Sequence, residues 1–134
     1  MLKRDGNDHD PHQKKVGETM IHDMNLHSEP FEKMKKGTKT IELRLNDEKR
    51  RLIRAGDLIE FHHALDRSEK LMVKVVQIFR FRSFAELYSA LPLDQCGYRS
   101  DELATADPGD MDQYYPKEKQ DLYGVLGIQI TLDI

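Results

Sequence analysis

The sequence predicts one small α+β domain, built on a mainly antiparallel sheet or small barrel with helices packed at its ends. Segments with strand-like alternation outnumber helical segments along the chain. The stretches between them are too short for repeated βαβ crossovers. The 134 residues, 38% of them hydrophobic, match the length of one domain and can supply one core without a metal or disulfide.

The first part of the chain differs from the rest in its low apolar content. Residues 1–19 contain almost no apolar side chains besides Leu2 and Val16, and they show neither helical nor strand periodicity. We therefore expect residues 1–19 to form a flexible N-terminal arm and residues 20–134 to form the folded domain.

A strand followed by a short helix is expected next. The partly apolar run 21–26 indicates the strand, and Ser28 is a typical N-cap residue for the helix. Phe31 and Met34 would share one face of this helix. Gly37 can end it in the left-handed conformation.

Residues 38–45 alternate with a period of two, which predicts a half-buried strand. One face carries Thr40, Glu42 and Arg44, and the other carries Ile41, Leu43 and Leu45. Lys39 shares the parity of the apolar face, but a twist or bulge at the strand entry can turn it to the polar side. The simplest interpretation of the polar face is a solvated surface with a Glu42–Arg44 pair.

The remaining elements follow in order. A turn at residues 55–57 separates the basic run 50–54 from a strand at 58–61, and a long strand follows at 71–81. Ser83 and Glu86 fit the capping-box pattern of a helix that extends to about residue 90. Residues 94–116 are polar and irregular, and residues 123–132 predict a closing strand.

Charge and cysteine content restrict the classes of function. A net charge of −3 argues against a broad grip on duplex nucleic acid, yet residues 31–56 hold nine basic and four acidic side chains and can meet an anion. The single cysteine, Cys96, excludes an internal disulfide and favours a reduced, cytoplasmic setting. No apolar run approaches the roughly 18 residues of a membrane span, so no membrane partner is expected.

A combination of motifs resembles one known family. It comprises Gly37-x-Lys39-Thr40-x-Glu42-x-Arg44, the short helix before it, the turn Ala55-Gly56-Asp57 before a strand, and the ending Tyr114-Tyr115-Pro116-Lys117-Glu118 with Tyr123-Gly124-Val125. This order and spacing resembles the ASCH domain, a PUA-like family. The match is best over residues 21–80.

The resemblance implies a small PUA-like β-barrel with flanking helices and a cleft lined by Lys39, Glu42 and Arg44. ASCH domains are generally regarded as RNA- or nucleotide-binding modules, and an arginine fork suits phosphate or a base edge. We expect Thr40 to be a lesser fourth contact and Tyr115 to supply a ring for a base. The expected partner is single-stranded RNA or a nucleotide, with no cofactor and no metal ion.

An amidohydrolase is the alternative. Some ASCH proteins resemble enzymes that deacylate N4-acetylcytidine with a Lys and a Thr of this motif and a distant Glu. Lys39 matches the Lys, but Glu42 occupies the position of the Thr, so a hydrolase here would use Lys39 and Glu42 as an acid–base pair. Glu102 and Glu118 are the regional candidates for the distant Glu. A third interpretation is a domain with no ligand of its own.

Other chemically active side chains carry weaker signals. Histidines 9, 12, 22, 27, 62 and 63 lack the ligand spacing of a metal site, so surface or capping roles are expected. Cys96 has no clear histidine partner and is interpreted as a free thiol. Tyr98, Tyr114 and Tyr123 are further stacking candidates, and they are equally consistent with packing.

Overall fold

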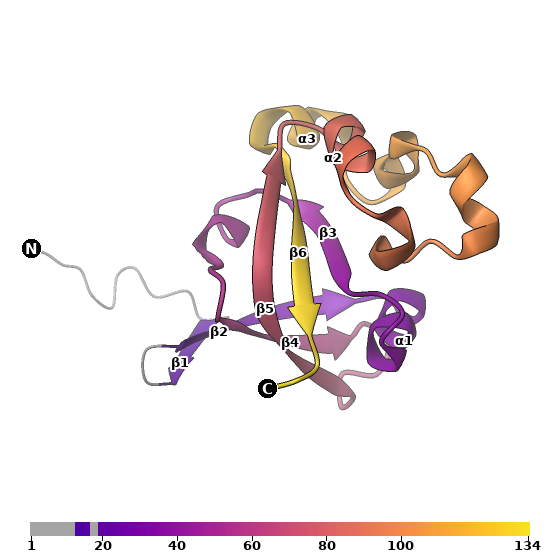
Figure 1. Cartoon of the computed structure of the whole chain (residues 1–134). Helices are drawn as coiled ribbons and strands as arrows, with labels where there is room; N and C mark the ends of the chain where they lie inside the picture. Colours follow the sequence, from indigo (N-terminus) through magenta and orange to yellow (C-terminus); the bar gives the residue numbers. More distant parts are fainter. Residues whose placement is uncertain (1–12, 17–18) are drawn as a thin grey trace, which may run out of the picture.

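A six-stranded sheet carries helices at its ends in the computed structural model, which describes residues 13–16 and 19–134 (Figure 1). The strands are β1 (Gln13–Val16), β2 (Thr19–Leu26), β3 (Ile41–Leu45), β4 (Leu58–His63), β5 (Lys70–Phe81) and β6 (Val125–Thr131). The helices are α1 (Ser28–Lys36), α2 (Phe84–Ala90) and α3 (Lys117–Tyr123). Short 3-10 helices are η2 (Arg50–Leu52), η3 (Leu93–Cys96), η4 (Ser100–Thr105) and η5 (Pro108–Gln113). The predicted α+β class is confirmed.

The strands follow the order β1-β2-β4-β5-β6-β3, and every neighbouring pair is antiparallel except the parallel pair β2–β4. The longest strand, β5, has a register shift between Val75 and Gln77. In Figure 1, β2 and β4 run roughly horizontally, while β3, β6 and the upper part of β5 run roughly vertically. Among the described strands, no backbone pairing joins β3 back to β2, so β1 and β3 are the edges of the sheet.

The N-terminal region differs from the expectation for residues 1–19. Gln13–Val16 forms β1 and pairs with the start of β2, at Thr19–His22. Backbone pairing with β2 defines this strand, and the sequence pattern alone did not indicate it. Residues 1–12 and 17–18 lie outside the described residues.

Helix α1 turns the chain toward β3. Phe31 and Met34 are fully buried on one face, as predicted, and Gly37 ends the helix at φ 86°, where its amide donates to the Met34 carbonyl. A residue without Cβ adopts this left-handed conformation at little cost. The predicted N-cap is wrong by one residue, because His27 occupies that position and makes no side-chain cap hydrogen bond.

Two apolar clusters share β6 between them. The first holds Met24, Phe31, Ile59, Phe61, Val73, Leu126 and Ile128 with their neighbours, and the second holds Ile41, Leu43, Leu45, Phe84, Leu87 and Val125. In the β3–β6 register, Glu42 lies opposite Ile128 and Arg44 opposite Leu126. Cross-strand partners point to the same face of a sheet. The polar face of β3 therefore points toward the first cluster, so the interpretation of that face as a solvated surface is wrong.

The region expected to be irregular, 94–116, contains most of η3 and all of η4 and η5, which are 3-10 helices. It runs from α2 to α3 and projects beside β3 in Figure 1. Helix α3 was not predicted. No helix in the described part of the chain combines the length and apolar content that crossing a membrane requires.

Candidate functional site

A cleft of about 620 Å³ lies between the α1 side of the domain and the segment that carries η3, η4 and η5. Its walls include Asn25 from β2, Tyr98 from the loop after η3, and Tyr115 from the loop before α3. Its volume falls in the range of small-molecule and cofactor pockets, roughly 300–1,000 Å³. Lys39, Glu42 and Arg44 all line it.

Three charged side chains meet at the base of this cleft. Glu42 Oε2 accepts from Arg44 Nε at 2.5 Å, and Glu42 Oε1 lies 3.3 Å from Lys39 Nζ. Glu42 is only 4% exposed and Lys39 only 6%. A buried carboxylate between two cations is stabilised by charge pairing where water cannot solvate it.

The pKa of Glu42 reflects this balance. Burial alone would raise it, but the charges of Arg44 and Lys39 and their hydrogen bonds outweigh burial, and the pKa of Glu42 is lowered from its ordinary value of 4.5. The carboxylate is therefore ionised at neutral pH.

Lys39 uses all of its hydrogen-bonding capacity within the protein. Its ammonium donates to the Ile41 carbonyl at 3.0 Å and to the Cys96 carbonyl at 2.9 Å, and it pairs with Glu42. An ammonium has three donors and no acceptor. Lys39 therefore links the start of β3 to the end of η3, and in this arrangement it has no further N–H for a ligand.

Arg44 is different because it lines the cleft and one nitrogen of its guanidinium has no partner among the described residues. Nε binds Glu42, and Nη2 donates to the Asn25 carbonyl at 2.5 Å. Nη1 makes no hydrogen bond to any described residue. Since Asn25 belongs to β2, Arg44 also bridges the two strands that no backbone pairing connects.

The two remaining predicted contacts, Tyr115 and Thr40, lie in different places. Tyr115 lines the cleft, stacks on Phe84 with ring centroids 6.1 Å apart, and donates its hydroxyl to the Leu43 carbonyl at 3.4 Å. Burial raises the pKa of Tyr115. Thr40 is not among the lining residues, and its hydroxyl instead donates to Gln95 Oε1 at 3.2 Å.

A hydrogen-bonded chain of two tyrosine hydroxyls and one carboxylate also lines the cleft. Tyr98 donates to Asp110 Oδ2 at 2.7 Å and shares a 2.6 Å hydrogen bond with Tyr88. Burial raises the pKa of Tyr88 to about 12 and also raises that of Tyr98. Sequence reasoning missed Tyr88 and Asp110, because no spacing pattern links a helix residue to an aspartate in a 3-10 helix.

An exposed aromatic pair stands at the rim. The Tyr114 and His27 rings lie 6.2 Å apart, and Tyr114 is 54% exposed. Both residues line the cleft. Tyr123, the other stacking candidate, is not among the lining residues, and its ring lies 5.9 Å from the guanidinium of Arg51.

The two glutamates named for a hydrolase are separated by the fold. Glu102 lines the cleft and accepts from the Arg99 amide at 2.7 Å, whereas Glu118 lies exposed on α3 and is not among the lining residues. Burial raises the pKa of the Cys96 thiol to about 11. Cys96 is a buried free thiol, in agreement with its interpretation from the sequence.

The histidines take several roles. His63 caps a loop, since its Nδ1 accepts from the amides of Leu65 and Asp66. His22 is buried, not at the surface as expected, and its Nε2 lies 2.8 Å from Asp57 Oδ2. His62 lies beside two carboxylates on the outer face of the β2–β4 pair.

Comparisons with known proteins give a consistent result. The ASCH domain model matches residues 24–133. The crystal structure of hypothetical protein PH0355 is similar to this chain with 36% identity and a TM-score of 0.68, covering 83% of this chain and 97% of that one. The solution NMR structure of protein PF0455 from Pyrococcus furiosus is similar with 35% identity and a TM-score of 0.60, covering 83% and 96%. No curated protein matches. The family match and both structural matches span most of the chain, and on this basis the chain belongs to the ASCH domain family.

Proposed function

We propose that the cleft binds a nucleotide or a short single-stranded RNA, with Arg44 as the principal contact. The observation that carries this proposal is the state of the Arg44 guanidinium. Glu42 and the Asn25 carbonyl hold it on two sides, while Arg44 lines the cleft and its Nη1 has no described partner. A guanidinium fixed in this way loses little entropy when it binds a phosphate or a base edge.

The rim supplies the second requirement for single-stranded recognition. Tyr114 and His27 present aromatic surfaces beside the cleft, and Tyr114 is more than half exposed. Bases that are not paired can stack on such rings regardless of sequence. The ASCH family is generally considered an RNA-binding family, and membership in it supports the same partner class.

The strand arrangement supports an entrance at this position. In the PUA-like barrel that we propose for the domain, β2 and β3 flank the gap, and the Arg44–Asn25 hydrogen bond crosses it. Lys39 and Glu42 then act as positioning residues, because the Lys39 ammonium has no donor left and Glu42 holds the cations of both Lys39 and Arg44.

Binding is tested by fluorescence anisotropy with a short single-stranded RNA at two salt concentrations. Arg44→Lys keeps the positive charge next to Glu42 but removes the planar guanidinium, which can donate two parallel hydrogen bonds. The variant should bind the RNA roughly tenfold or more weakly, as expected when such a bidentate contact is lost. Arg82→Lys is the matched control, because the Arg82 side chain is 91% exposed and lies outside the cleft. Equal affinity of wild type and Arg44→Lys, or binding that does not weaken with salt, would refute the proposal.

A hydrolase remains the second candidate, because Lys39 and Glu42 form an ion pair at the cleft base. Glu42 could serve as base for a water that attacks an acyl group on a nucleoside. The test is turnover of N4-acetylcytidine by wild type and by Lys39→Ala, with circular dichroism to verify folding. Turnover that disappears in a folded variant would establish the hydrolase and end the binding-only interpretation. No turnover by wild type would remove the hydrolase.

A further inference from the structure

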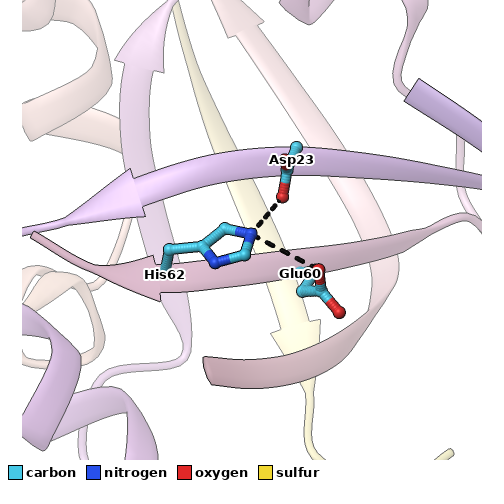
Figure 2. A group of neighbouring side chains, drawn as sticks. All are labelled: Asp23, Glu60 and His62. Atoms are coloured by element: carbon cyan, nitrogen blue, oxygen red, sulfur yellow. Dashed lines mark hydrogen bonds and ion pairs between the residues drawn. The ribbon is translucent and has the colours of Figure 1, made fainter. Parts of the chain in front are cut away.

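Away from the cleft, three side chains with metal-ligating atoms converge on the parallel strand pair β2–β4 (Figure 2). Asp23 lies opposite Glu60 in the register, and His62 follows two residues later on the same face of β4. The alternating neighbours Met24 and Phe61 are buried in the first core cluster. The three side chains therefore project from the outer face of a regular sheet, where backbone pairing holds their Cα positions.

The donor atoms are already close together. His62 Nε2 lies 2.5 Å from Asp23 Oδ1 and 3.3 Å from Glu60 Oε1, and all three donor atoms lie within 4.8 Å of one another. Two ligands on one Zn²⁺-sized ion, each at about 2.0–2.2 Å, are separated by roughly 3–3.5 Å. Small side-chain rotations would place an ion at the centre of the group.

The Nε2 atom of the imidazole is directed into this group. The His62 side chain is only 10% exposed, Figure 2 shows its ring turned toward both carboxylates, and its buried Nδ1 has no hydrogen-bond partner in the described part of the chain. Asp23 and Glu60 both form ion pairs with His62, and the Lys49 ammonium donates to the Asp23 main-chain carbonyl. Two carboxylates that share one imidazole leave negative charge that a divalent cation can neutralise.

We propose that Asp23, Glu60 and His62 bind a divalent first-row metal ion of the Mn²⁺ to Zn²⁺ group. Two carboxylates and one imidazole suit these ions, and three protein ligands leave positions open for water. The affinity is expected to be modest, because a ligating imidazole normally donates its other N–H to an acceptor and Nδ1 of His62 has none here. This site is independent of the nucleotide cleft proposed above.

The test is isothermal titration of the chelator-treated full chain with Zn²⁺ and, separately, Mn²⁺. Wild type should bind one equivalent, and Glu60→Gln and His62→Gln should each weaken that binding at least tenfold, with unchanged circular dichroism. Because the two variants remove different ligand atoms, weaker binding in both indicates lost metal ligation and not a local folding defect of one variant. An anomalous difference map from a Zn²⁺-soaked crystal should place the ion between the three side chains.

Two controls address other sources of binding. Glu69→Gln alters the other group of ligating atoms, Glu32, His63 and Glu69, in which Glu69 already pairs with Lys35. A His9→Ala/His12→Ala variant removes the histidines near the N-terminus. Neither control should change the affinity. Absence of binding by wild type at millimolar metal, full affinity in both site variants, or loss of binding in either control would overturn the proposal.

Discussion

Replacing Glu42 with glutamine tests whether the buried carboxylate holds the base of the cleft together. Glutamine has almost the same shape and can still accept from Arg44 Nε, but it carries no charge. Its amide group would also face the ammonium of Lys39, which is itself a donor. The variant therefore leaves two buried cations near each other without a counter-charge.

The size of the effect follows from burial. The Glu42 side chain is 5% exposed and that of Arg44 is 12%, so solvent screens this cluster little. Removing one partner of a buried ion pair costs about 3–5 kcal/mol, which is a large share of the 5–15 kcal/mol that stabilises a typical domain. At about 4 °C per kcal/mol for a domain of this size, the melting temperature should fall by roughly 12–20 °C.

The measurement is urea unfolding and thermal melting of wild type and Glu42→Gln at neutral pH. The matched control is Glu48→Gln, because Glu48 is exposed and forms no ion pair with a described residue. Its free energy of unfolding should change by no more than about 0.5 kcal/mol. If the two variants lose the same small free energy of unfolding, the Glu42 carboxylate does not stabilise the fold through a buried charge cluster.

Three further predictions concern the pH dependence of stability, two glycines with positive φ, and the tyrosine hydroxyls of the cleft. Because the folded-state pKa of Glu42 is lowered below 4.5, its stabilising effect is present above that pH and is lost as pH falls through the folded value. Acid titration should therefore narrow the difference in free energy of unfolding between wild type and Glu42→Gln. A difference that stays constant with pH would contradict the lowering of the Glu42 pKa by Arg44 and Lys39. Gly124→Ala should cost about 2–3 kcal/mol in urea unfolding, because φ is 75° and a Cβ would lie 2.9 Å from a main-chain carbonyl oxygen. A Cβ added at Gly37 would have no atom within 4 Å apart from its chain neighbours, so Gly37→Ala should cost only about 1 kcal/mol. Equal losses of stability in the Gly124 and Gly37 variants would contradict the steric argument. Tyr98→Phe should cost about 1–3 kcal/mol by thermal melting and exposed Tyr114→Phe almost nothing, and the reverse order would exclude a structural role for the hydroxyl chain.

Much of the fold could be predicted because local chemistry and tertiary structure agree in those segments. The alternation in residues 41–45 is that of a strand, and Gly37 ends a helix in the conformation that glycine adopts most easily. Helix α3 escaped prediction because its inward-facing residue is Gln120, which is 3% exposed and donates to Asp112 and the Tyr115 carbonyl. A helix held by an amide network shows no apolar stripe.

The candidate site was predictable only in part. Alternation groups Glu42 with Arg44, but the direction of that face depends on β6, a strand far away in the sequence, which places Ile128 opposite Glu42. Sequence parity favours the apolar side for Lys39, but Lys39 precedes β3, and the carbonyls of Ile41 and Cys96 hold its ammonium beside Glu42. Asp110 enters the cleft from a 3-10 helix whose position depends on long-range packing.

Contact between Arg44 and the ligand can be followed at the side-chain Nε–H resonance of Arg44 in a ¹⁵N-labelled sample titrated with short single-stranded RNA. This resonance should shift in proportion to saturation, together with the amides of Gly97 and Tyr115 around the cleft. Unchanged cleft resonances, with shifts confined to the arginine-lined groove of Arg51, Arg54 and Arg80, would contradict this contact.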